Sequence, residues 1–268
     1  MEVGKNINIV TAKMPKRRRK NRFPWLLIIF LSVGLIFMVI FSEQKSIFPF
    51  KQNSNALLDS VPQNFSIYGI DISHYQKKIN WDKLAQFKYK HITITFVFIK
   101  ATEGVNYVDP MWDEHWKNAK THGFVRGAYH YYKPNLDPVK QMNHFLKQVF
   151  FENGDLSPVL DVEEDPVLIS HQQFVKNVLT ALRYLENKTG ITPILYTNYA
   201  FYKQYFMGED FRKYPLWIAH YYKKSPPDDI PWNFWQFHDK MSLDGIMGNV
   251  DMNIYCCSFA EFKKFLKN

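Results

Sequence analysis

Four carboxylates lie within five positions in the segment LDVEED, residues 160–165. Asp161 and Glu163 are two positions apart, so on a strand their side chains project to the same face. Two carboxylates this close cannot both ionise cheaply in a partly desolvated site, which leaves a protonated acid beside a charged partner. Hydrolysis of a glycosidic bond needs this pair, because one group protonates the leaving oxygen while the other stabilises positive charge at the sugar carbon.

The same acids also have a purely structural explanation. Carboxylates at such positions cap helices or pair with surface lysines, and a DxE triplet without context is a weak motif. Glu164 and Asp165 lie nearer Pro166 and the following loop, so we assign these two acids to such structural roles.

A metal site is a further alternative for the acidic residues. Asp161, Glu163, Asp71 and Asp251 could together hold a hard cation such as Ca²⁺. No pair of histidines four positions apart accompanies a nearby acid, which argues against zinc. The aromatic residues near these acids suit a sugar better than an ion. We therefore predict neither a metal ion nor another cofactor.

Short apolar runs that alternate with helical patterns would position these residues. The eight runs are Tyr68–Ile72, Thr93–Ile99, Val125–Tyr131, Pro158–Val162, Pro193–Tyr196, Leu216–Ala219, Trp232–Phe237 and Val250–Tyr255. Alternation of strands and helices over such a length indicates a parallel sheet, and eight strands favour a closed β/α barrel. The last three strands lie close together, so we expect a barrel that is irregular in its later part. An open doubly wound sheet is the alternative.

Capping residues mark the starts of the helices between these runs. Asp109 and Asp137 each precede a proline, which predicts an N-cap followed by a first-turn proline. Ser170 with Gln173, and Ser258 with Glu261, have the spacing of a capping box.

Polar and aromatic residues gather where the apolar runs end, which is where a barrel carries its functional groups. They are Asp71, Ser73, Gln76, Lys100, Glu103, Tyr129, His130, Tyr132, Asp161, Glu163, Tyr196, Asn198, Trp217, His220, Trp235, Gln236, His238, Asp251 and Asn253. A ring of such residues at equivalent strand positions favours a functional site over chance. Lys100 is expected to pair with an acid as a structural contact.

The positive charge of the chain is concentrated at its beginning. Residues 1–22 hold eight basic residues and one acid, which is +7 of the net charge of +9. The rest is nearly neutral, so we exclude a nucleic-acid-binding face on the main domain.

An uncharged apolar stretch follows this basic cluster. Residues 25–41 would span about 26 Å as a helix, close to the hydrocarbon thickness of a bilayer. A cleaved signal peptide is the alternative, but no small-residue cleavage site follows. We expect a cytoplasmic segment (1–23), a transmembrane anchor (24–41), a tether (42–65) and a folded domain (66–268). The positive-inside rule places that domain outside the cell membrane, in the periplasm or at the cell surface.

The chain contains two cysteines, which are the neighbours Cys256 and Cys257. Their number and spacing fit neither a disulfide framework nor a zinc site. We expect two small, partly buried residues on a late strand, with a disulfide between the neighbours as the alternative.

The chain resembles glycoside hydrolase family 25, the Chalaropsis-type lysozymes. The matching segments, in the order of the family and across residues 66–268, are YGIDISHYQKKINW, FIKATEGVNYVDP, WKNAKTHGFVRGAYHYY, SPVLDVEED, PILYTN, PLWIAHYY, WNFWQFHD and GIMGNVDMNIY. The resemblance implies a modified β/α barrel with five β/α units and three further strands. It also implies hydrolysis of the β-1,4 bond between N-acetylmuramic acid and N-acetylglucosamine in peptidoglycan, without a cofactor.

Roles for individual residues follow from the same resemblance. Glu163 would be the general acid and base, and Asp161 would assist the substrate's acetamido group, with direct nucleophilic attack by Asp161 as the competing mechanism. Asp71 and Asp251 would form the floor of the site. Tyr129, Tyr196, Trp217 and Gln236 would line the cleft. The alternatives are a barrel that binds sugars without turnover and a hydrolase of chitin-like chains.

Overall fold

The computed structural model describes residues 58–226 and 228–268. Its strands are β1 (Ile67–Ile72), β2 (Ile94–Glu103), β3 (Tyr107–Val108), β4 (Val125–Tyr131), β5 (Val159–Asp161), β6 (Ile194–Asn198), β7 (Leu216–Ala219), β8 (Phe234–Met241) and β9 (Val250–Tyr255). Its α-helices are α3 (Trp81–Ala85), α4 (Trp112–Thr121), α5 (Pro138–Gln148), α6 (His171–Thr189), α7 (Tyr199–Tyr205) and α8 (Phe259–Phe262). Three short 3-10 helices are η1 (His74–Gln76), η2 (Glu209–Phe211) and η3 (Lys263–Phe265).

The predicted N-terminal segments lie largely outside this description. Residues 1–23, the expected anchor 24–41 and the first part of the expected tether are not among the described residues. Within the described ranges, no helix has the length and apolar character needed to cross a membrane.

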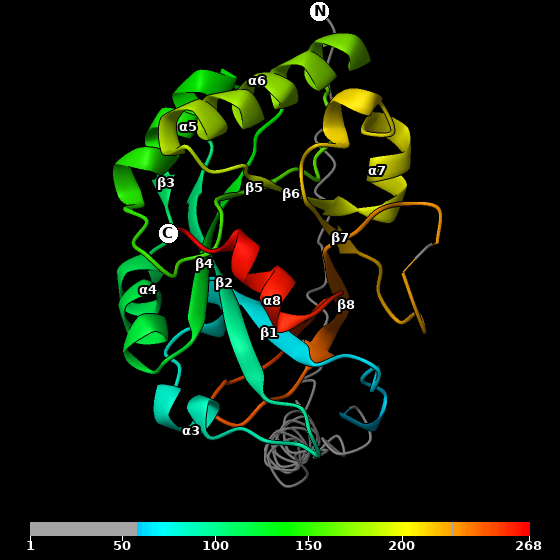
Figure 1. Ribbon diagram of the computed structural model, residues 1–268. Coiled ribbons are helices and arrows are strands. Elements are labelled where there is room, and N and C mark those ends of the chain that lie inside the picture. Colours follow the sequence, from blue (N-terminus) through cyan, green and yellow to red (C-terminus); the bar gives the residue numbers. More distant parts are fainter. Residues whose placement is uncertain (1–57, 227) are drawn as a thin grey trace, which may run out of the picture. The chain divides into compact units, whose positions relative to one another are not determined.

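Eight strands form a closed barrel. β1, β2, β4, β5, β6, β7 and β8 are parallel neighbours in this order, and β9 closes the ring by pairing antiparallel with both β8 and β1. The helices α3–α7 follow the first five of these strands and lie outside the ring (Figure 1). The predicted barrel of five β/α units and three further strands is therefore confirmed, and the open sheet is excluded. β3, a short partner of the end of β2, was not predicted.

Three of the four predicted caps form, and the fourth is wrong. Asp137, Ser170 and Ser258 each accept a backbone N–H at the start of their helix. The box at Ser170 is only half made, because the Gln173 amide contacts Asn177 instead. Asp109 does not cap α4, whose N-cap is Met111.

Alternation along the strands divides the apolar side chains into two layers. Phe96 and Phe98 of β2 point into the barrel, whereas their neighbours Val97 and Ile99 pack outward beneath the helices. Gly69 and Gly127 make room for the two inward phenyl rings, because a Cβ at either glycine would overlap the facing ring. The interior is therefore a packed apolar core at the amino ends of the parallel strands. Polar side chains gather at the carboxyl ends of these strands, which we call the upper end of the barrel.

The two residues that follow β9 form a disulfide with each other. Cys256 and Cys257 are bonded to each other. The expectation of two free cysteines was wrong, and the alternative that the sequence left open is the correct one.

Candidate active site

An acidic pair forms the floor of the site at the upper end of the barrel. Asp71 of β1 and Asp251 of β9 are direct partners across the antiparallel seam. Burial raises the pKa of Asp71 to about 6, although two side-chain amides donate to its carboxylate. Burial and the nearby Asp71 raise the pKa of Asp251 to about 9. Near neutral pH the two groups therefore hold one proton between them.

Gln236 of β8 is the centre of the polar contacts around this floor. Its Nε2 donates to Asp71 Oδ2 at 2.7 Å and to Asp251 Oδ2 at 3.2 Å. Its Oε1 accepts from the hydroxyls of Tyr196 and Tyr221, each at 2.7 Å. All four hydrogen-bonding positions of the amide are occupied, so Gln236 orients the acids and tyrosines rather than remaining free for a ligand.

Asp161 and Glu163 lie where β5 ends. The side chain of Asp161 is buried, and its Oδ1 has no hydrogen-bond partner in the described part of the chain. Burial and the nearby Glu163 raise the pKa of Asp161 well above its usual range. Burial and Asp71 raise the pKa of the half-buried Glu163 to about 7, and Lys100 opposes the rise. The pair can thus present a protonated acid beside an acceptor that is free to bind a ligand.

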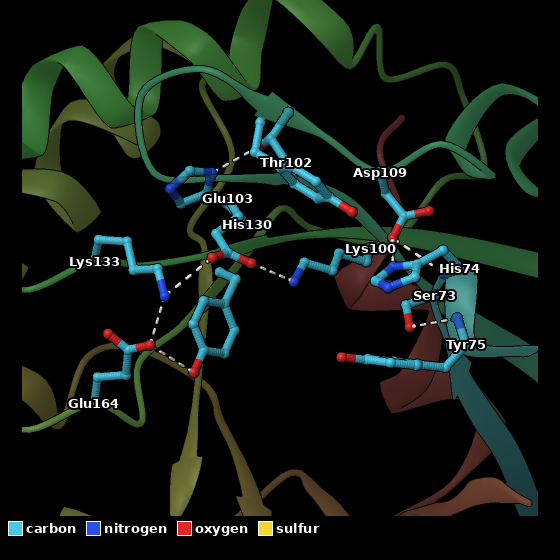
Figure 2. A network of polar contacts seen from close by, with 12 residues as sticks. Ser73, His74, Tyr75, Lys100, Thr102, Glu103, Asp109, His130, Lys133 and Glu164 are labelled. Carbon is cyan, nitrogen blue, oxygen red and sulfur yellow. Dashed lines mark hydrogen bonds and ion pairs between the residues drawn. The ribbon is translucent and has the colours of Figure 1, made fainter.

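A chain of ion pairs runs from Lys100 to Glu164, the residue that follows Glu163 (Figure 2). Lys100 Nζ lies 2.7 Å from Glu103, Glu103 lies 3.0 Å from Lys133 Nζ, and Lys133 Nζ lies 2.6 Å from Glu164. The hydroxyl of Tyr131 donates to Glu164 at 3.1 Å, and both ammonium groups lie over the Tyr131 ring. The predicted pairing of Lys100 with an acid is confirmed, and so is the structural role of Glu164. This chain of contacts also fixes the residue that follows Glu163.

Three aromatic residues were expected to line the cleft, and the structure places them at different depths. Tyr129 is partly exposed, and burial beside several acids raises its pKa well above the usual range. Tyr196 is buried, with its hydroxyl bonded to Gln236. Trp217 is only 2% exposed, and its Nε1 donates to Asn253 at 2.8 Å. The Trp217 ring packs against Phe98 and Tyr196, and its expected place in the lining of the cleft stays a prediction.

Asn253 was selected from the sequence as one of the residues at the strand ends, but without a role, and Tyr221 was not selected. Both residues contact the floor. Asn253 Nδ2 donates to Asp71 Oδ2 at 2.8 Å, and Tyr221 reaches Gln236 from the loop after β7. The alternation along β9 places Asp251 and Asn253 on the same strand face, which is a signal that could have predicted the contact of Asn253 with the floor. No pattern in the sequence identifies a loop residue such as Tyr221.

The donor groups of the site do not form a cation cage. Among residues 58–226 and 228–268, no group of three or more His, Cys, Asp or Glu side chains is arranged to hold a metal ion.

Comparisons with known proteins agree on one family. The family model "Glycosyl hydrolases family 25" matches residues 70–246. The Escherichia coli K12 protein YegX is 40% identical over 207 residues, which cover 77% of this chain and 75% of YegX. Lysozyme M1 of Streptomyces globisporus is 30% identical over 216 residues, which cover 75% of this chain and 72% of the lysozyme.

Solved structures agree with the sequence comparisons. A family 25 glycosyl hydrolase from Bacillus anthracis superposes with a TM-score of 0.68 at 27% identity, covering 76% of this chain and 95% of that chain. A bacterial lysozyme from Streptomyces coelicolor superposes with a TM-score of 0.67 at 28% identity, covering 76% of this chain and 98% of the lysozyme chain. Sequence, fold and the acidic site thus lead to the same conclusion: the chain is an enzyme of glycosyl hydrolases family 25.

Proposed function

We propose that this chain is a muramidase that hydrolyses the β-1,4 bond between N-acetylmuramic acid and N-acetylglucosamine in peptidoglycan. Family membership and the similarity to proteins named as lysozymes support the reaction class. The observation that carries the assignment to particular residues is the buried, unpartnered Oδ1 of Asp161 beside Glu163, whose pKa is raised to about 7. A protonated acid next to an unused acceptor is the arrangement that glycoside hydrolysis needs.

Glu163 acts twice in the proposed reaction. It first protonates the glycosidic oxygen as the bond to the anomeric carbon breaks, and the leaving sugar departs with that proton. The resulting carboxylate then removes a proton from a water molecule, which attacks the anomeric carbon and restores protonated Glu163. A pKa of about 7 suits both steps near neutral pH, because the acid and its conjugate base are then both accessible.

Asp161 assists the acetamido group of the substrate. The carbonyl oxygen of that group attacks the anomeric carbon and forms a cyclic intermediate, while Asp161 Oδ1 accepts the amide N–H. The positive charge of this intermediate favours the charged form of Asp161, which is disfavoured in the free site. Glycan strands without N-acetyl groups test this role: they resist cleavage if the acetamido group reacts, and they are cleaved if Asp161 itself is the nucleophile.

The reaction is tested with the full-length chain, wild type beside Glu163→Gln. Both are incubated with purified peptidoglycan, and new reducing ends are identified by mass spectrometry. We expect new N-acetylmuramic acid ends, formed at least about a hundredfold more slowly by the variant. A folded wild-type protein that binds peptidoglycan without any product would establish a binding barrel instead. Cleavage of chitin-like chains alone would change the substrate class.

The proposed enzyme is held at the cell membrane. The basic residues 1–22 and the uncharged run 25–41 support a single span with a cytoplasmic N-terminus. The anchor would keep the enzyme on the cell that makes it, which suits remodelling of that cell's own wall. Alkaline extraction of membranes is expected to leave the full-length chain in the pellet, and protease added outside is expected to remove residues 66–268. Release into the supernatant would overturn the anchor.

A further inference from the structure

An exposed tyrosine stands directly after the strand that supplies the acidic floor. Tyr75 belongs to η1, four residues beyond Asp71, and its side chain is 76% exposed. Its ring lies 4.2 Å from the His74 ring, with 34° between the planes. We call His74 and Tyr75 together the aromatic platform. A single exposed ring is ordinary on a protein surface, so the case for a binding role rests on the position of Tyr75 beside the site and on the support of its backbone.

The backbone beneath the aromatic platform is held by several independent contacts. Ser73 and Gln76 form a complete capping box around η1, and the Gln76 amide also donates to Asn249 O at 3.0 Å. The buried Asp109 accepts from both the backbone N and the ring Nδ1 of His74, at 3.1 and 2.8 Å (Figure 2). Asp109 was expected to cap a helix, but its carboxylate binds His74 instead. This amount of support for one exposed ring indicates a preformed binding surface.

The aromatic platform continues the site that contains the catalytic pair. Tyr107 of β3 lies 6.4 Å from His74 between ring centroids, and Lys100 Nζ lies 5.7 Å from the Tyr107 ring. Lys100 is the cation that lowers the pKa of Glu163. Exposure rises along this path, from 8% at Lys100 to 39% at Tyr107 and 76% at Tyr75. The path therefore leads from the reacting centre out to solvent, on the side formed by β1 and β2.

We propose that the aromatic platform binds a pyranose ring of the same glycan strand, beyond the sugars joined by the cleaved bond. The inference rests on the proposed function, since it assigns a further subsite to that polymer. The C–H face of a pyranose is flat and slightly positive, which matches the negative face of an aromatic ring. A tyrosine ring also loses little conformational entropy when it is covered. Stacking on Tyr75 raises the affinity for long strands and leaves the chemistry at Glu163 unchanged.

The test compares substrates of different length with the full-length chain. Tyr75→Ala is measured beside Tyr75→Phe, which keeps the ring, on a tetrasaccharide and on long glycan strands. Phe150→Ala is the matched control, because Phe150 is 79% exposed and precedes β5 at the opposite end of the barrel. We expect Tyr75→Ala to raise KM for long strands about three- to tenfold, with kcat unchanged and the tetrasaccharide unaffected. Tyr75→Phe and Phe150→Ala should match the wild type on both substrates.

An equal rise of KM for both substrates in Tyr75→Ala, or an unchanged KM for long strands, would overturn the proposed subsite. Binding of long strands to Glu163→Gln, with and without Tyr75→Ala, gives a second result that does not depend on turnover. The same weakening of Kd is expected there, and an unchanged Kd would also overturn the proposal. Failure of the proposed function is recognised separately, because the wild type would then cleave neither substrate.

Discussion

Replacement of Lys100 by methionine tests whether a buried cation sets the working pH of the catalytic pair. Lys100 is buried on the inner face of β2, and its ammonium lowers the pKa of both Asp161 and Glu163. Methionine keeps an unbranched apolar side chain of similar length and removes the charge. Glu103 loses one partner in the variant but keeps its contact with Lys133 at 3.0 Å, so we expect the domain to stay folded.

The size and sign of the effect follow from the charges. An opposite charge within a few ångströms lowers a carboxyl pKa by about 1 to 3 units. Lys100 shares its charge with Glu103, so its removal is expected to raise the pKa of Glu163 by about one unit. In the proposed mechanism Glu163 must be protonated to act as the acid, so we expect activity to be lost as pH rises past its pKa of about 7. The alkaline limb of the pH profile should therefore move about one pH unit higher.

The assay is kcat/KM of the full-length chain on soluble glycan strands across the pH range. Lys133→Met is the matched control, because it removes a cation of the same network that is not among the groups that shift the pKa of Glu163 or Asp161. An alkaline limb that does not move in Lys100→Met, or that moves to lower pH, would refute the reasoning. An equal shift in Lys133→Met would show that the network acts only by holding the loop.

Three further predictions concern stability. The pKa of Asp251 is raised from its ordinary value of 3.8 to about 9 in the folded chain, so this residue destabilises the fold increasingly as pH rises from the first value to the second. Asp251→Asn should therefore raise Tm more at pH 8 than at pH 5, and an equal gain at both pH values would contradict this. Asp155→Ala leaves the buried guanidinium of Arg126 without its 2.7 Å partner, and urea unfolding should show a loss of about 3–5 kcal/mol rather than less than about 1. Gly69→Ala should cost about 1–3 kcal/mol in the same assay, whereas Gly208→Ala, with open space around it, should be near neutral.

The barrel could be predicted because buried parallel strands appear in the sequence as short apolar runs between helical patterns. The boundaries were less accessible. The second run was predicted to end at Ile99, whereas β2 continues to Glu103. The prediction stopped early because the inward side chains change from phenyl rings to polar groups at the site. A strand that enters an active site loses the apolar pattern by which it is recognised. The segment of the strand that carries the site residues is therefore predicted to be a loop.

The direction of the last strand could not be predicted from local patterns. β9 runs antiparallel to both neighbours, so the end that reaches the site is its beginning, where Asp251 lies. Apolar alternation is the same in either direction, and pairing between β1 and β9 depends on residues far apart in the sequence. The rule that function follows the C-terminal ends of strands therefore fails for this one strand.

The sequence indicated which charged residues lie near one another better than it indicated how deeply each side chain is buried. The acids could be found because clustered carboxylates are unusual, and four of them do lie at the upper end of the barrel. The burial of Trp217 and the use of all four positions of the Gln236 amide depend on how neighbouring strands pack. Residue type and spacing alone do not separate a group that touches a ligand from one that supports it.

The antiparallel seam also has a consequence for the order of events when the chain folds. Asn253 reaches Asp71 across 182 positions of sequence, and β9 is the last strand to be made. Closure of the ring therefore waits for a contact between the two ends of the domain, which is slow to form. The same contact delivers Asp251 and Asn253 to the floor of the site. A chain interrupted after β8 lacks both the closed barrel and half of its acidic floor, so the enzyme gains activity only in the step that completes its fold.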